Sequence, residues 1–154
     1  MSKDLQADMK ELVTQFKTVL MATSSQDAEP EVSYSPYAIV DGQLHVFVSD
    51  LSMHTGNLKS NPKCSLLFIE SEQDAENLHA RKRVTFRATA VLIDRQSDQF
   101  RAAMNAMQER FGEIMQVLES LPDFHLFAMQ TDSAILVKGF ADAHTVECDG
   151  FPTP

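Results

Sequence analysis

The sequence predicts a mainly β protein (β+α), an antiparallel barrel of six or seven strands with peripheral helices. Short apolar or alternating segments recur along most of the chain, as strands do. Asp41-Gly42, the preferred chemistry of a two-residue hairpin turn, joins two of these segments. Few segments have helical spacing, and many strands with few helices favour an antiparallel barrel over a parallel α/β sheet.

The first elements are expected to be a helix and three strands. An amphipathic helix is predicted over about residues 3–17, where apolar residues recur at helical spacing: Leu5, Met9, Leu12, Val13 and Phe16. Residues 19–23 form a short apolar strand, and a polar run ending at Pro30 makes the turn after it. Residues 31–40 and 43–49 are strand-like, and the second segment alternates between two faces.

Residues 51–70 combine a polar loop, a short helix and a buried strand. Ser52 is expected to cap the helix, because its hydroxyl can accept a bond from a free backbone N–H of the next turn. Asn61-Pro62 ends the helix, since proline disfavours helical geometry in the residue before it. Residues 64–69 are almost wholly apolar and suit an interior strand. A helix N-terminus beside a sheet edge can hold an anion such as a cofactor phosphate.

The second half of the chain continues the pattern. A polar surface loop is expected over residues 70–79, and residues 81–93 alternate strictly, as a strand would. A helical region follows, with a stripe of Met, Phe and Leu side chains from Phe100 to Leu118 and a break at Gly112. This stripe is interpreted as core, or as a dimer face, rather than a cofactor box. Two strands, about 124–130 and 133–146, end the chain, with Asp132 as the turn former between them.

Composition excludes several classes of function. The 154 residues fit one domain, 1–154. Thirteen basic residues against 22 acidic ones give a net charge of −9, which argues against nucleic-acid or anionic-membrane partners. No segment approaches the roughly 20 apolar residues of a membrane span. Two cysteines are too few for a disulfide framework, so a cytoplasmic location is expected, and no CxxC or HxxxH spacing indicates structural zinc.

The order of these elements resembles the FMN-binding split barrels related to pyridoxamine 5′-phosphate oxidase. Within that superfamily it is most similar to the haem-utilisation branch of the HugZ/HutZ type. Four segments carry the resemblance, at residues 19–39, 46–70, 80–93 and 121–146. The second is the most specific, because the HTxNL and NPxxSLL elements of that branch occur together in it. In the last segment the branch pattern GGFGRA is KGFADA, so one arginine is missing.

The resemblance implies a split β-barrel homodimer with cofactor pockets at the subunit interface, for FMN or haem. In flavin-binding members, hydroxyls at a strand end and a Ser-Arg-Lys loop hold the phosphate; these positions correspond to Ser49 and to residues 52–54. An arginine of the family falls near Ser33 and a lysine near Ala38. The site therefore keeps hydroxyls, helix N–H groups and one histidine, but it has no permanent cation. Charge-assisted hydrogen bonds are roughly twice as strong as neutral ones, so the loss of these cations weakens the binding of a phosphate.

Haem-branch members are understood to bind haem and to open its ring with a reductant and oxygen. Their ligand histidine is expected beyond the last strand, and no histidine follows His144 in this sequence. His144 therefore has two interpretations, a polar group at the dimer interface and a substitute axial haem ligand.

The sequence thus nominates one set of cofactor-binding residues and one metal ligand, His144. The cofactor-binding candidates are Ser33, Ser49, Ser52, Met53, His54, Thr55, Asn57, Arg81 and Arg83. Each has a structural alternative: a helix cap, a strand-end hydroxyl, an exposed polar residue, or an arginine facing solvent or the acidic loop. As a group that titrates near pH 6.5, His54 would complement an anion more strongly in mild acid.

No Ser-His-Asp, paired-carboxylate or Gly-rich phosphate-loop arrangement is present, so redox chemistry would belong to a bound cofactor. The expected function is a haem-utilisation-type protein that binds a planar anionic redox cofactor, haem or FMN, at a dimer interface. The alternatives are an FMN-dependent oxidoreductase of the wider superfamily and a non-catalytic binding protein on the same fold. Whether the protein is an enzyme stays open at this point.

Overall fold

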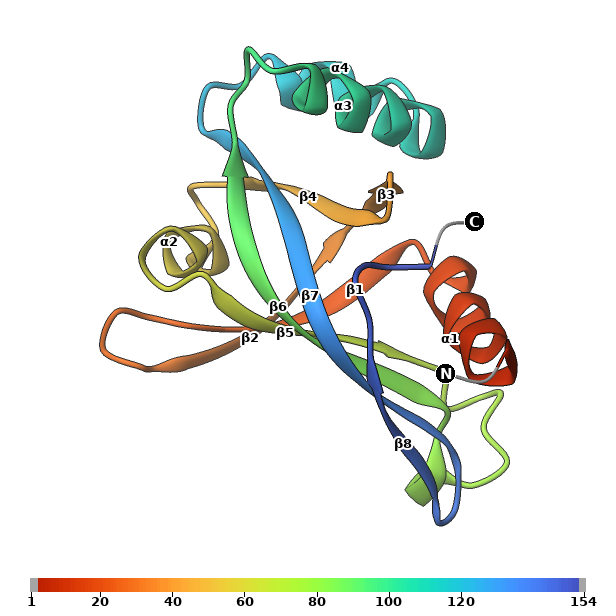
Figure 1. The fold of residues 1–154 in the computed structure, drawn as a ribbon. Helices are drawn as coiled ribbons and strands as arrows, with labels where there is room; N and C mark the ends of the chain where they lie inside the picture. Colours follow the sequence, from red (N-terminus) through yellow and green to blue (C-terminus); the bar gives the residue numbers. More distant parts are fainter. Residues whose placement is uncertain (1–2, 153–154) are drawn as a thin grey trace.

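The computed structural model describes residues 3–152, in which eight strands form one antiparallel sheet (Figure 1). The strand order is β2-β1-β5-β6-β7-β4-β3, with β8 paired to β7. The strands are β1 (Thr18–Ser24), β2 (Pro30–Pro36), β3 (Ala38–Val40), β4 (Gln43–Ser49), β5 (Lys63–Ile69), β6 (Arg83–Ile93), β7 (Phe124–Gly139) and β8 (Asp142–Glu147). The helices are α1 (Lys3–Gln15), α2 (Met53–Ser60), the 3-10 turn η1 (Leu78–Ala80), α3 (Asp98–Phe111) and α4 (Ile114–Glu119).

The main core fills the inside of the curled sheet. Alternate residues of successive strands point inward, and Met21, Leu66 and Phe86 have no exposed surface. The apolar stripe of α1 packs against this core, and β2 also approaches β4, which closes the sheet toward a barrel. The hydroxyl of Tyr37 donates a 2.7 Å hydrogen bond to the carbonyl of Phe16, which ties the segment after α1 to the sheet.

A second core lies between the α3–α4 pair and the outer side of β3, β4 and β7. Phe100, Met104 and Met107 of α3 pack there against Phe47 of β4. The hydroxyl of Ser97 caps the start of α3 by accepting a hydrogen bond from the N–H of Phe100. The helix α3 ends at Gly112, whose φ is 89°. The interpretation of the Met and Phe stripe as core is confirmed.

The antiparallel mainly β fold is confirmed, although the strands number eight rather than six or seven. The hairpin turn at Asp41-Gly42 is present, and both residues have positive φ, 52° and 76°, as a type I′ turn requires. Residues 31–40 do not form one strand, because the chain leaves β2 before Tyr37 and re-enters the sheet as β3.

The predicted break near Asp132 is wrong, because β7 runs without interruption through it. Arg87 pairs with Ser133 and Ala88 with Thr131, which leaves Asp132 as the extra residue of a β-bulge. The actual turn before β8 contains Ala141, whose φ is 55°. Continuous pairing with β6 therefore outweighs the local turn preference of the aspartate.

None of the helices within residues 3–152 has the length and apolarity that crossing a bilayer requires.

Candidate functional site

A cleft of about 440 Å³ opens between β2, the end of β4 and the start of α2. Its size is within the roughly 300–1,000 Å³ range of small-molecule sites. Five residues nominated from the sequence line it together: Ser33, Ser49, Ser52, Met53 and His54. The cleft therefore assembles, from three elements, the positions that the family resemblance assigned to a cofactor.

His54 is the most enclosed polar side chain of this group, with 8% of its surface exposed. Its Nδ1 lies 2.8 Å from the hydroxyl oxygen of Ser33 on β2. Burial lowers the pKa of His54 from 6.5, and the nearby carboxylate of Glu31 only partly opposes this shift. The imidazole is thus neutral near pH 7, so the interpretation of His54 as an exposed polar residue is wrong, and burial opposes its role as a cation.

The hydroxyl of Ser49 is already engaged within the protein. It donates a 2.8 Å hydrogen bond to Asp123 and accepts a 3.1 Å bond from the N–H of Leu51. The carbonyl of Asp123 also accepts a 2.8 Å bond from the N–H of Asp50. A carboxylate therefore lies directly beside the serine that the family resemblance assigned to a flavin phosphate.

Ser52 occupies the N-cap position of α2, as predicted, but its side chain makes no capping hydrogen bond. Two further candidates on α2 face inward and do not line the cleft. Thr55 is completely buried and donates a 2.5 Å bond to the carbonyl of Ser49, while Asn57 donates a 3.1 Å bond to the hydroxyl of Thr23. The two side chains attach α2 to β4 and β1, and so position His54 and Ser52.

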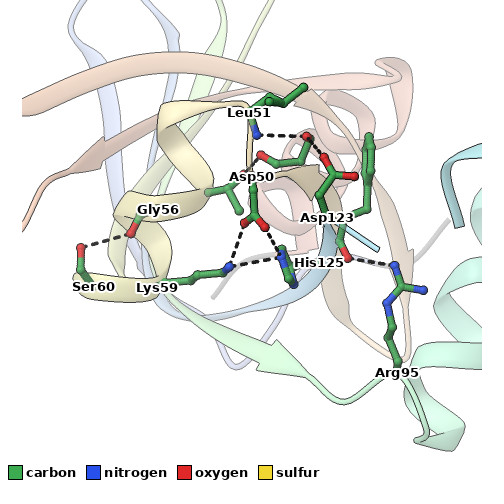
Figure 2. Close-up of polar contacts among 11 residues, drawn as sticks. Asp50, Leu51, Gly56, Lys59, Ser60, Arg95, Asp123 and His125 are labelled. Atoms are coloured by element: carbon green, nitrogen blue, oxygen red, sulfur yellow. Dashed lines mark hydrogen bonds and ion pairs between the residues drawn. The ribbon is translucent and has the colours of Figure 1, made fainter. Parts of the chain in front are cut away.

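Lys59, the cation of α2, is held away from the cleft. Its Nζ lies 2.8 Å from one carboxylate oxygen of Asp50 and 3.2 Å from Nε2 of His125, which in turn lies 3.0 Å from the other oxygen of Asp50 (Figure 2). These two partners lower the pKa of the Asp50 carboxyl, the lysine being the larger cause. The positive charge of Lys59 is therefore balanced locally.

Three candidates lie at the other end of the molecule, near η1 and β8 (Figure 1). Arg81 donates bonds of 3.0 and 2.6 Å to the carbonyl of Glu70, and Arg83 donates a 3.0 Å bond to the carbonyl of Arg81. Nε2 of His144 lies 2.5 Å from the carboxylate of Asp142. The structure does not bring these side chains to the cleft.

The cleft also has an aromatic wall that the sequence interpretation missed. Phe47 and Phe124 line it with ring centroids 5.2 Å apart. The guanidinium of Arg95 lies 5.7 Å from the centre of the Phe47 ring and donates a 3.0 Å bond to the carbonyl of Phe124. Phe47 could have been found from its alternation with Ser49, but the pairing of Ser49 with Phe124 joins strands far apart in the sequence.

The charges of the cleft decide which ligands suit it. No lysine or arginine lines it, whereas Glu31 does. A flavin phosphate with nearly two negative charges would meet hydroxyls, a neutral imidazole and two nearby carboxylates, so the residues present do not fit tight FMN binding. A planar, largely apolar group fits better, because aromatic and aliphatic side chains form most of the remaining lining.

Comparisons with known proteins agree with this architecture. A family model described as pyridoxamine 5′-phosphate oxidase matches residues 5–138. The chain is 39% identical over 145 residues to haem oxygenase HutZ of Vibrio cholerae, covering 94% of this chain and 82% of that protein.

The solved structures that are similar to the chain include two haem-related proteins. A crystal structure of HutZ from Vibrio cholerae, described as a haem storage protein, superposes with a TM-score of 0.83 at 36% identity, covering 88% of this chain and 96% of that one. Campylobacter jejuni ChuZ gives a TM-score of 0.87 at 24% identity, covering 99% of this chain and 63% of that one. The second likeness shows the fold alone.

Proposed function

The chain belongs to the pyridoxamine 5′-phosphate oxidase family, and from this membership we propose that it binds haem in the cleft between β2, β4 and α2. Similarity to HutZ over most of both chains supports haem rather than another planar ligand. HutZ is described both as a haem oxygenase and as a haem storage protein, and both roles require haem binding. The proposed setting is haem utilisation in bacterial iron acquisition.

The charge of the cleft is the single observation that carries this proposal. Charge-assisted hydrogen bonds from lysine or arginine strengthen phosphate binding, and the cleft has neither residue in its lining. Haem presents a broad apolar ring whose faces suit Phe47, Phe124 and Met53. Bound haem would supply the redox and oxygen chemistry, while the protein binds and shields it.

The same proposal includes a homodimer that pairs through the outer face of the sheet. Tyr34, Leu20, Leu67, Thr85 and Ile135 follow one another as cross-strand partners from β2 to β7. Tyr34 is 63% exposed, and Leu20 and Ile135 are each 42% exposed, so this row, the outer row, presents apolar surface to water. Exposed apolar surface of this kind marks interaction sites.

The outer row is continuous with the cleft, because Tyr34 lines both. A second copy on this face would therefore border the bound haem, which accords with a pocket at a subunit interface. We also propose a reducing cytoplasm as the location, since Cys64 and Cys148 are both free thiols. We propose that residues 1–154 form one split-barrel domain.

Haem titration followed by visible absorption tests this function. Wild-type protein is expected to shift the Soret band and to saturate, while Met53→Glu places a carboxylate in the cleft and should weaken binding by roughly tenfold or more. Met53 is 67% exposed, so the substitution should not disturb folding. Leu51→Glu, two residues earlier at a 93% exposed position outside the cleft, is the matched control. Absence of a Soret shift in the wild type would reject the proposal, and equal losses in both variants would reject the cleft.

A further inference from the structure

We propose that a groove on the outer face of the sheet, formed by β1, β5, β6 and β7, binds the phosphate group of a small molecule. Figure 1 shows these neighbouring strands side by side. The groove measures about 650 Å³, within the roughly 300–1,000 Å³ range of small-molecule sites. It shares no lining residue with the cleft between β2, β4 and α2, so this inference does not depend on the proposed function.

The first argument is the position of two cations in the groove, Lys63 on β5 and Arg87 on β6. In the antiparallel pairing of these strands Lys63 is opposite Thr89, and Arg87 is opposite Ser65, two residues further along the same face. Lys63 and Arg87 are therefore diagonal neighbours. Such neighbours lie roughly 7–8 Å apart, within reach of long side chains, so one ligand can contact the ammonium and the guanidinium together.

The second argument is that neither cation is neutralised by the protein. Within residues 3–152, the side chains of Lys63 and Arg87 make no hydrogen bond or ion pair, and Asp132, the one carboxylate of the groove lining, bonds neither of them. Lys59 and Lys138, by contrast, each form an ion pair with an aspartate. Two neighbouring positive charges repel each other, so an anion bound between them would relieve an unfavourable interaction.

The third argument is the set of hydroxyl groups around the cations. Ser65 and Thr89 lie beside them on the same face, and within the described part of the chain neither hydroxyl makes a hydrogen bond. Ser24, which also lines the groove, accepts a 2.7 Å bond from the side-chain amide of Asn61, which leaves its own proton to donate. A phosphate offers three strong acceptor oxygens, and bonds to charged donors are roughly twice as strong as neutral ones. These donors therefore suit a phosphate.

The fourth argument is the local structure that shapes the groove. Ala22 pairs with Ser65, so only small side chains lie on the β1 side of the two cations. On the β7 side the sheet has the β-bulge in which Asp132 is the extra residue. The hydroxyl of Thr131 donates a 2.8 Å bond to the carbonyl of Arg87, which fixes the backbone from which the guanidinium extends. Bulges are frequent next to functional sites, where they redirect side chains.

Titration with inorganic phosphate at constant ionic strength, followed by the backbone amide shifts in NMR spectra, tests the site. Wild-type protein should show saturating shifts for the amides of Ser65 and Arg87. The Lys63→Gln/Arg87→Gln protein should bind phosphate roughly tenfold more weakly or worse, because it lacks both charged donors. Lys10→Gln/Lys17→Gln is the matched control, since it removes the same charge at exposed positions outside the groove and should bind as the wild type does. Shifts that do not saturate, or equal losses in the two variants, would overturn the proposal.

Two further measurements on the Lys63→Gln/Arg87→Gln protein separate this site from the cleft and from the proposed dimer contact. Its haem titration should match that of the wild type, because the groove and the cleft have no lining residue in common. Its sedimentation equilibrium should also match, since neither residue belongs to the outer row. Loss of haem affinity would assign the cations to the haem site, and a changed oligomeric state would assign them to the subunit contact; either result would overturn the proposal. A wild type that binds phosphate but no haem would leave the groove assigned and reject the proposed function.

Discussion

The hydroxyl of Ser49 donates a 2.8 Å hydrogen bond to the carboxylate of Asp123, 74 residues later in the chain. This bond joins the end of β4 to the residue that precedes β7, directly beside the start of α2. It places negative charge at the position where the flavin-binding relatives are understood to hold a phosphate. The pair therefore opposes the binding of a flavin phosphate at this position.

Neutralising Asp123 should make the cleft more tolerant of phosphate. Asp123→Asn keeps the shape of the side chain and removes its charge, so FMN affinity should rise by roughly tenfold, equivalent to about one hydrogen bond to a charged group. Quenching of flavin fluorescence on titration measures this affinity. Asp98→Asn, on the exposed first turn of α3, is the control and should change nothing. Equal affinity in the Asp123→Asn and wild-type proteins would show that this carboxylate does not repel the phosphate.

Arg95 should stabilise the aromatic wall of the cleft, which Phe47 and Phe124 form. Its guanidinium donates to the carbonyls of Glu119, Leu121 and Phe124, and it stacks near Phe47. Arg95→Ala should lower the free energy of unfolding by roughly 2 kcal/mol, because three carbonyls lose a charged donor. Urea denaturation measures this loss, and haem affinity should fall with it.

Arg95→Lys separates charge from geometry. A lysine keeps the positive charge but cannot offer several donors in one plane. The lysine variant should therefore resemble Arg95→Ala in stability. Wild-type stability in Arg95→Lys would mean that charge alone matters at this position.

The hairpin, the loop-helix-strand and the alternating strand were predictable because each follows from local chemistry. Asp41-Gly42 takes the two positive φ angles that few other pairs accept, and Asn61-Pro62 ends α2 where proline forbids its continuation. The turn at Ala141 was not predictable, since alanine has no preference for a positive φ. The strand β7 continues past Asp132 because it pairs with β6 on both sides of this residue, whereas the local sequence around Asp132 favours a turn.

The residues of the cleft were predictable only in part. A family motif located Ser49, Ser52 and His54, and the structure gathers them in one cleft. It did not show that Thr55 turns inward or that Asp123 binds Ser49, because these contacts depend on how α2 and the start of β7 pack.

A charge placed in the outer row should separate the proposed dimer. Ile135→Arg puts a guanidinium at the β7 end of the outer row, where burying an unpaired charge in the proposed contact is costly. Sedimentation equilibrium should show a dimer for the wild type and a monomer for the variant. Val117→Arg is the matched control, because Val117 is 57% exposed on α4, outside this row. A monomeric wild type, or a dimeric Ile135→Arg protein, would count against this interface.

Acid should destabilise the haem-free protein through its buried histidines. Burial lowers the pKa of His45 from 6.5, although a backbone hydrogen bond to Gln43 and the charge of Asp41 oppose it. Below about pH 6.5 the unfolded chain therefore binds more protons than the folded one, and stability falls as the pH drops toward the folded-state pKa. Above that pH the histidine contributes no pH dependence.

Urea denaturation at neutral pH and at about pH 5 measures this slope, and His45→Gln should flatten it. His54 adds a slope of the same sign, so the single variant should flatten the dependence only in part. His79→Gln, in the exposed turn η1, should leave it unchanged. A steeper slope in His45→Gln than in the wild type would contradict this explanation.

Parallel equilibrium titrations of the wild-type protein with haem and with FMN show which of the two cofactors the cleft binds. We expect haem to saturate the protein at one molecule per chain with a shifted Soret band, and FMN to keep its free fluorescence across the same range. Tight flavin quenching without a Soret shift would contradict haem binding in this cleft, because a cleft without fixed cations would then be holding the phosphate.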